Sequence, residues 1–115
     1  MKKPASEESR CDAIVAQLYG SSAIIRFGRK GARTPNTEGV PDRLYICGSR
    51  LIFFEVKSAH DYLSPKQISF LSRILASDGI AGCGGSAELL VLLNAPKPYL
   101  AGHAQIERFK NRIGR

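Results

Sequence analysis

The sequence predicts one α/β domain, spanning residues 1–115, in which a mixed central β-sheet is flanked by helices. A chain of 115 residues has room for a single hydrophobic core. Its composition, with 43% hydrophobic and 23% charged residues, is that of a globular protein. Segments with helical spacing alternate with short apolar runs in the order α-β-β-β-α-β-α, which is typical of a sheet packed between helices.

The composition also excludes several classes of protein. No apolar run approaches the ~20 residues that span a bilayer, and the first residues lack the apolar segment of a signal peptide. The three cysteines are far apart and match neither a disulfide framework nor a Cys-x-x-Cys zinc site, so we expect reduced thiols in a cytoplasm. The net charge of +7 favours a polyanionic partner, and nucleic acid is the usual one.

The first helix and strand are predicted before a basic loop. The helix begins after Ser6, whose hydroxyl suits an N-cap, and ends at Gly20. Residues 23–27 are predicted to form the first strand. Residues 28–39 are basic and rich in glycine, proline and asparagine, which indicates a loop. Such a loop suits contact with a phosphate backbone, and the alternative is a solvated linker.

The next two strands are predicted to form a hairpin. Residues 42–47 and 50–57 are separated by Gly48-Ser49, a pair that favours a two-residue type II′ turn. With that turn, Asp42 lies opposite Glu55, so two carboxylates face each other on one side of the sheet. Strand alternation places Lys57 on the same face as Glu55.

The second half of the chain is predicted to contain two helices and a strand. The run Ser64-Pro65-Lys66-Gln67 combines an N-cap, a proline at the first helical position and a capping box. Residue 80 is expected to begin a short strand, residues 88–93 to form the last strand, and residues 103–113 a closing helix. The glycines at 82 and 84 match part of a dinucleotide fingerprint, but an expected strand after them argues against that function.

The opposed carboxylates carry the chemistry that the sequence predicts. Like charges directly across a strand pair are destabilising unless a cation or a proton lies between them. Two carboxylates can bind Mg²⁺, and a neighbouring lysine can orient a water or stabilise charge on a phosphoryl group. Asp42, Glu55 and Lys57 therefore indicate phosphodiester hydrolysis. The alternative is an exposed salt-bridge cluster of the same three residues.

The motif resembles that of a known nuclease superfamily. Pro41-Asp42, twelve intervening residues and Glu55-Val56-Lys57 resemble the PD-(D/E)xK signature. Together with Gly39-Val40 before it and Leu63-Ser64-Pro65-Lys66-Gln67 after it, the motif resembles the virus-type replication-repair nuclease (VRR-NUC) family over residues 7–93. Stand-alone members of this kind are similar to phage-encoded proteins. The resemblance implies a restriction-endonuclease-like α-β-β-β-α-β core and a nuclease of a bacterial or phage-infected cytoplasm.

The resemblance also implies roles for individual residues. Asp42 and Glu55 would bind Mg²⁺ or Mn²⁺ together with the backbone carbonyl of Val56, and Lys57 would be the catalytic lysine. Gln67 would be a further active-site residue, although a pure capping-box role is its alternative. The family places a further glutamate on the first helix near the metal. Helical spacing favours Glu7 over Glu8 for this position, and compensation of the helix dipole is the alternative for both.

The expected reaction is cleavage of DNA, and the resemblance favours branched DNA such as a four-way (Holliday) junction. Symmetric cutting of two strands favours a homodimer, with residues 89–93 or 99–104 as its interface. Contacts to DNA are expected from Arg29, Lys30, Arg33 and Lys66. Two alternatives stay open. One is a non-catalytic basic nucleic-acid-binding module, and the other is a nuclease of flap, nicking or restriction-type specificity.

Overall fold

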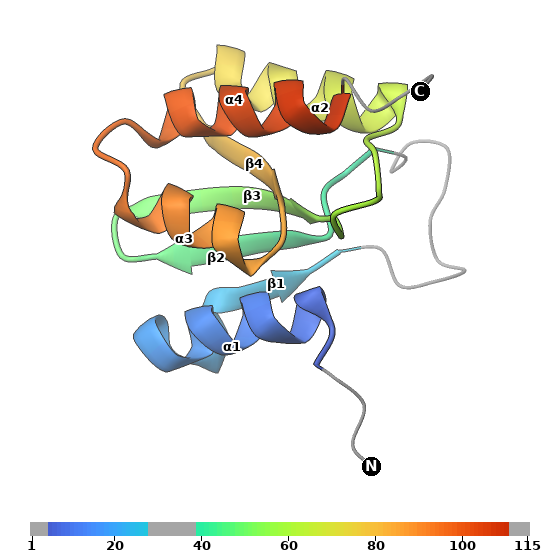
Figure 1. Cartoon of the computed structure of the whole chain (residues 1–115). Helices are drawn as coiled ribbons and strands as arrows, with labels where there is room; N and C mark the ends of the chain where they lie inside the picture. The colour runs from blue at the N-terminus through green and yellow to red at the C-terminus, as the bar shows by residue number, and fades with distance from the viewer. Residues whose placement is uncertain (1–4, 28–38, 111–115) are drawn as a thin grey trace.

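In the computed structural model, which describes residues 5–27 and 39–110, a four-stranded mixed sheet lies between two pairs of helices (Figure 1). One pair, α1 and α3, packs on one face of the sheet, and α2 and α4 pack on the other side. A short 3₁₀ turn covers Ser21–Ala23. The elements in chain order are α1 Glu7–Tyr19, β1 Ile24–Arg26, β2 Arg43–Cys47, β3 Arg50–Val56, α2 Pro65–Ala76, β4 Ile80–Gly84, α3 Ser86–Asn94 and α4 Pro98–Lys110.

The caps predicted for the first two helices are confirmed. The Ser6 hydroxyl accepts a hydrogen bond from the Ser9 N–H at 3.1 Å and begins α1. At α2 the Ser64 hydroxyl accepts from the Gln67 N–H, and the Gln67 side-chain oxygen accepts from the Ser64 N–H at 2.9 Å. This reciprocal capping box sets the first turn of α2 beside the end of the hairpin.

The predicted hairpin and its register are confirmed. Strands β2 and β3 pair antiparallel, with Cys47 opposite Arg50 and Leu44 opposite Phe53. Gly48 has a φ of 65°, the positive value that the first position of a type II′ turn requires. Strand β1 pairs antiparallel with β2, and β4 pairs parallel with β3, so β3 lies inside the sheet. The order α-β-β-β-α-β runs from α1 to β4.

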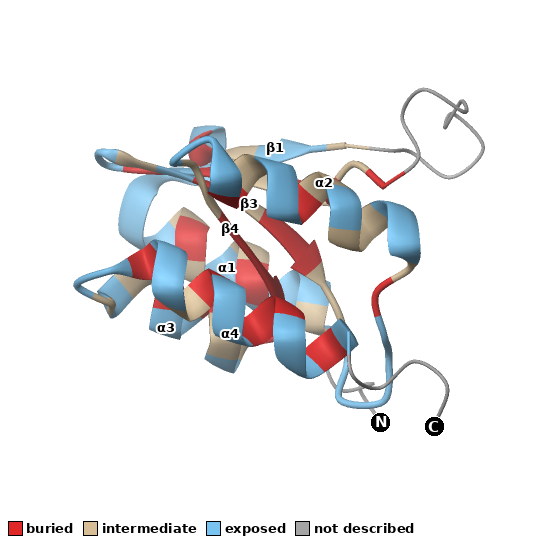
Figure 2. Cartoon of the chain, turned by 90° about the horizontal axis from the view of Figure 1, so that it is seen from above, coloured by how far each residue is buried: buried red, intermediate tan, exposed pale blue. Residues whose placement is uncertain are grey.

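Two hydrophobic cores hold the helices against the sheet (Figure 2). Helices α1 and α3 share one core with alternate side chains of β2 and β3, among them Tyr45, Ile52 and Phe54. Helices α2 and α4 share the other with Ala81 and Cys83 of β4. Helix α4 approaches β4 so closely that a side chain at Gly102 would collide with the Ala81 carbonyl. Within the described residues, no helix is long and apolar enough to cross a membrane.

The last strand was predicted in the wrong place. Residues 88–93 lie in helix α3, and the fourth strand is the shorter run Ile80–Gly84. A short apolar run such as 88–93 fits either a buried strand or a buried helix, so its periodicity does not separate the two. Leucine is a good helix former, and burial of Leu89 and Leu92 follows the helical spacing. The closing helix α4 also begins earlier than predicted, at Pro98.

A strand was expected after the glycines at 82 and 84 and argued against a dinucleotide site. This expectation was wrong, because helix α3 follows those glycines. The backbone amides at the start of α3 are nevertheless engaged by carboxylates. The Gly85 N–H donates to Glu88 Oε1 at 2.7 Å, and the Ser86 N–H donates to Glu7 Oε2 at 3.1 Å. A pyrophosphate would have to displace both carboxylates, so this turn is not suited to a dinucleotide.

The three cysteines are free and buried, as the sequence predicted. Burial raises the pKa of the Cys11 and Cys83 thiols to about 12, and that of Cys47 to about 11. Nearby carboxylates, Glu7 for Cys11 and Glu55 for Cys83, act in the same direction. The thiols therefore stay protonated and serve as small core side chains.

Candidate active site

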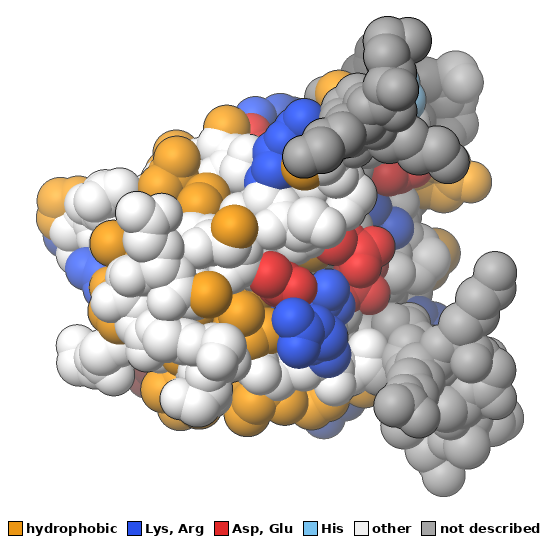
Figure 3. All heavy atoms as spheres, turned by 90° about the horizontal axis from the view of Figure 1, so that it is seen from below, with side chains coloured by type: hydrophobic (Ala, Val, Ile, Leu, Met, Phe, Trp, Pro, Cys, Tyr) orange, Lys and Arg blue, Asp and Glu red, His pale blue; other side chains and the backbone are white. Residues whose placement is uncertain are grey.

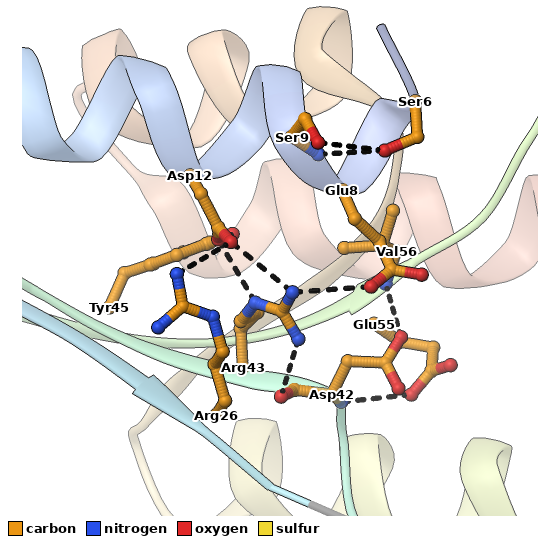
Figure 4. A network of polar contacts seen from close by, with 10 residues as sticks. All are labelled: Ser6, Glu8, Ser9, Asp12, Arg26, Asp42, Arg43, Tyr45, Glu55 and Val56. Carbon is orange, nitrogen blue, oxygen red and sulfur yellow. Dashed lines mark hydrogen bonds and ion pairs between the residues drawn. The ribbon is translucent and has the colours of Figure 1, made fainter. Parts of the chain in front are cut away.

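The hairpin brings the two predicted carboxylates together at the end of the sheet (Figure 4). Asp42 directly precedes β2, and Glu55 is the next-to-last residue of β3. The Asp42 N–H donates to Glu55 Oε1 at 3.2 Å, and the Val56 N–H donates to Asp42 Oδ2 at 3.2 Å. Glu55 is only 4% exposed. These contacts make the two carboxylates immediate neighbours, as the two-residue turn at Gly48-Ser49 predicts.

Lys57 and Gln67 approach the same carboxylate. Lys57 Nζ lies 3.8 Å from Glu55 Oε2, and the Gln67 side-chain amide donates to that oxygen at 3.2 Å. Gln67 therefore caps α2 through one atom of its amide and contacts Glu55 through the other, so its two predicted roles are compatible. Because the side chains of Glu55 and Lys57 are only 5% and 16% exposed, this is not an exposed salt-bridge cluster.

The donor set fits a hard divalent cation. Within residues 5–27 and 39–110, no three histidine, cysteine or acidic side chains are grouped to hold a metal ion. A metal here would be held by the carboxylates of Asp42 and Glu55 and the carbonyl of Val56. This carbonyl points to the same strand edge as the Val56 N–H that reaches Asp42. Few protein ligands, with water and a phosphate completing the shell, are typical of Mg²⁺.

The two glutamates of the first helix lie in different environments. The Glu8 carboxylate contacts Arg43 Nη2 at 3.2 Å. The Glu7 carboxylate accepts from the Ser86 N–H and lies 3.5 Å from Arg10. Glu7 also lines a cavity of about 250 Å³ that it shares with Lys57, Glu88 and Arg108. Glu7 and Lys57 thus line one cavity, but among the described residues neither glutamate groups with Asp42 and Glu55 as a metal site.

A second polar cluster, which the sequence did not reveal, lies under the opposite face of the hairpin (Figure 4). Asp12 of α1 accepts from Arg43 Nε at 2.9 Å, Arg43 Nη2 at 3.2 Å, the Tyr45 hydroxyl at 2.8 Å and Arg26 Nη2 at 3.2 Å. We call these residues, together with Glu8, the Asp12 cluster. By strand alternation the Arg43 side chain points away from that of Asp42, and its partners on α1, Asp12 and Glu8, lie 31 and 35 residues away in the sequence.

The electrostatics of the Asp12 cluster favour its charged form. Burial opposes ionisation of Asp12, but hydrogen bonds from Arg43 and Tyr45 and the charges of Arg43 and Arg26 outweigh it and lower the pKa of Asp12. Burial and then the hydrogen bond to Asp12 raise the pKa of Tyr45. Burial disfavours the charged Arg43, yet Asp12 more than compensates and raises its pKa. The Arg43–Asp12 pair is therefore a permanent ion pair at neutral pH.

The surface on the α1 side mixes both signs of charge. In Figure 3 acidic and basic side chains lie next to one another near the middle of this face. Ion pairs that involve α1 include Glu7–Arg10 and Asp12–Arg26. This mixture of signs is unlike the uniformly basic surface that a DNA-binding face requires.

The residues expected to bind DNA are only partly described. Lys66 lies exposed in the first turn of α2, one residue before Gln67. Arg29, Lys30 and Arg33 lie outside the described residues. Lys66 is therefore the one predicted DNA contact that the structure locates, and it lies on the helix that begins beside Glu55.

Comparison of the chain with protein-family models, with curated proteins and with solved structures found no match in any of the three. The function is therefore argued from the chemistry of Asp42, Glu55 and Lys57 and from the fold that brings them together.

Proposed function

We propose that the chain is a metal-dependent DNA endonuclease that acts on branched DNA such as a four-way junction. The observation that carries the proposal is the cluster of Asp42, Glu55 and Lys57 at one end of the β2–β3 hairpin. The α-β-β-β-α-β order from α1 to β4 supports it, because the resemblance to the PD-(D/E)xK nucleases implies this order. The choice of branched DNA rests on the resemblance to the VRR-NUC family.

Each residue of the site has a chemical role in this proposal. Asp42, Glu55 and the Val56 carbonyl would hold Mg²⁺ or Mn²⁺, which would supply a Lewis acid for the phosphate and for acidification of a water. Lys57 orients the attacking water or donates a hydrogen bond to the phosphoryl oxygen as charge develops there. Gln67 holds the Glu55 carboxylate in place. Glu7 lines the cavity beside Lys57 and contributes a further carboxylate near the reacting phosphate.

The net charge indicates DNA as a partner, and exposed apolar side chains indicate a second copy of the chain. The net charge of +7 favours DNA, with Lys66 beside the site and Arg29, Lys30 and Arg33 as further contacts. We propose a homodimer, because cutting two strands of a junction needs two sites. The predicted interface segments now correspond to parts of α3 and α4 that expose apolar side chains, namely Leu90, Val91, Tyr99 and Leu100.

The test is cleavage of a labelled four-way junction and of a linear duplex of matched sequence. Each is incubated with Mg²⁺, Mn²⁺ or EDTA, and with wild-type protein or the Glu55→Gln variant. The expected result is metal-dependent cutting of the junction alone, reduced by ~10³-fold or more in the variant because a metal ligand is lost. The Glu107→Gln variant, which changes an exposed glutamate of α4, is the matched control and should cut normally.

Two other outcomes would change the proposal. Cutting of both substrates would keep the active site and replace branch selectivity with flap, nicking or restriction-type specificity. Tight binding without cutting, unaffected by EDTA and by Asp42→Asn, would identify a non-catalytic nucleic-acid-binding module. The net charge alone favours that second candidate.

A further inference from the structure

The Asp12 cluster lies against the backbone of Asp42, on the face of the sheet opposite the candidate active site (Figure 4). The Arg43 side chain is 9% exposed and directs both Nε and Nη2 to the Asp12 carboxylate. Its remaining nitrogen, Nη1, donates to the carbonyl of Asp42 at 3.2 Å. One guanidinium therefore joins helix α1 to the residue that begins the site.

The backbone of Asp42 is held from three directions. Its carbonyl accepts from Arg43 Nη1 and from the Phe27 N–H, the latter at 2.9 Å. Its N–H donates to Glu55 Oε1. The Asp42 carboxylate in turn accepts from the Val56 N–H at the end of the strand ladder. Among these contacts, the one from Arg43 comes from a side chain on the far face of the sheet, and it holds the peptide from which the Asp42 side chain projects.

Arg43 is itself positioned by Asp12 and not by solvent. A bidentate contact to a carboxylate fixes the plane of a guanidinium as well as its place. The Tyr45 hydroxyl and Arg26 hold the same carboxylate from the other side, at 2.8 Å and 3.2 Å. Glu8 accepts a hydrogen bond from the same guanidinium, through Nη2 at 3.2 Å. The chain of contacts therefore runs from Asp12 through Arg43 to the Asp42 carbonyl.

We propose that Asp12 and Arg43 are positioning residues, which orient the Asp42 carboxylate toward Val56 and the proposed metal from the opposite face of the sheet. Neither residue touches the reacting atoms. The catalytic consequence rests on the proposed nuclease function, whereas the orientation of Asp42 does not. Residues that orient a metal ligand from behind typically change metal affinity or activity by ~10–100-fold when they are replaced.

The first readout is the hydrogen-exchange rate of the Val56 amide, because this N–H donates to the Asp42 carboxylate. In Asp12→Asn the bidentate ion pair is lost at constant side-chain shape, so Val56 exchange should rise ~10-fold or more while the amides of α2 keep their rates. The matched control is Arg26→Ala, which removes another partner of Asp12 but no contact to Asp42. The control should leave Val56 exchange within about twofold of wild type.

The second readout is the affinity for Mn²⁺, with kcat and KM for junction cleavage. Asp12→Asn should weaken Mn²⁺ binding by ~10–100-fold and lower kcat, with little change in KM for DNA. A double-mutant cycle with Arg43→Lys tests the order of the contacts. If Asp12 acts through Arg43, the effect of Asp12→Asn should largely disappear in the Arg43→Lys background.

The outcomes separate this inference from the proposed function. Faster Val56 exchange in Asp12→Asn, together with a wild-type protein that neither binds Mn²⁺ nor cuts DNA, would support the orientation of Asp42 and overturn the nuclease. Equal behaviour of Asp12→Asn and Arg26→Ala, in a protein that does cut, would overturn the positioning role and leave the nuclease intact. Uniformly faster exchange across all elements would show that the Asp12–Arg43 pair only stabilises the fold, which also overturns it.

Discussion

Two clusters of charged residues lie on opposite faces of the β2–β3 hairpin, and they are built differently. Under one face, Asp12 accepts four hydrogen bonds from Arg43, Tyr45 and Arg26. On the other face, Asp42 and Glu55 are neighbours, and one lysine lies 3.8 Å from the pair. In the first cluster, the guanidinium groups of Arg43 and Arg26 lie within hydrogen-bond distance of the Asp12 carboxylate and neutralise its charge. In the second, backbone N–H groups and the side-chain amide of Gln67 donate hydrogen bonds to the two carboxylates.

The difference shows what each cluster contributes. A carboxylate that is fully matched by fixed cations stabilises the fold and has little left to bind. Two adjacent carboxylates keep a capacity for a cation, at some cost in stability to the folded chain. The hairpin therefore separates a structural ion pair from the proposed metal site by the thickness of one sheet. Measurements of stability should separate the two clusters.

Replacing Arg43 with methionine should have the largest effect. The variant keeps much of the buried volume but leaves Asp12 in a half-buried place without its bidentate partner. Removal of one member of a buried ion pair typically costs ~3–5 kcal/mol. Urea unfolding followed by circular dichroism would measure the loss. Arg26→Met, which alters the exposed partner of Asp12, should cost less than about 1 kcal/mol. A loss below ~1 kcal/mol for Arg43→Met would contradict a structural role for the pair.

Replacing Glu55 with glutamine should change stability little, although it should abolish cleavage. The amide keeps an acceptor oxygen for the Asp42 N–H and removes the like charge beside Asp42. It loses the attraction to Lys57 and the second acceptor oxygen, which receives the Gln67 amide. The expected change in the free energy of unfolding is less than ~1 kcal/mol in either direction. The same urea titration measures it. A loss of ~3 kcal/mol or more would show that Glu55 is a structural partner like Asp12, and not a functional carboxylate.

The smallest effect is the pH dependence of the Asp12 contribution. Because the folded-state pKa of Asp12 is lowered, its contribution is fully present above the unfolded pKa of ~3.9 and is lost as pH falls through the folded pKa. The stability difference between wild type and Asp12→Asn should therefore be constant between about pH 5 and 7 and should shrink below about pH 4. Urea unfolding of both proteins over this range measures the difference. A stability difference between the two proteins that stays constant down to about pH 3 would exclude the ionised Asp12 carboxylate as its source.

Local signals in the sequence predicted most of what lies close together along the chain. Gly48-Ser49 determined the hairpin register, and that register brought Asp42 to Glu55 without any knowledge of the helices. Ser64 and Gln67 determined the start of α2 through their capping box. These predictions succeeded because turns and caps depend on contacts between residues at most a few positions apart.

Predictions failed where the deciding contacts are distant in the sequence. Residues 88–93 were assigned to a strand, because nothing within the run shows which element will cover it. In the structure Leu89 and Leu92 lie on one side of a helix, in the core that α3 shares with α1, β2 and β3, and the carboxylate of Glu88 caps the start of that helix. Glu88 at the third helical position, after two glycines, was the local signal that indicated a helix.

By itself, the sequence determined the order of the helices and strands from α1 to α2, the caps of α1 and α2, and the proximity of Asp42, Glu55 and Lys57. Each depends on alternation, turn chemistry or a cap, which act over a few residues. Only the tertiary structure decided that α3 is a helix, that Gln67 reaches Glu55, and that Asp12 meets Arg43 beneath the hairpin. Those contacts join elements 12 to 31 residues apart, and packing of the helices on the sheet, not local preference, brings them together.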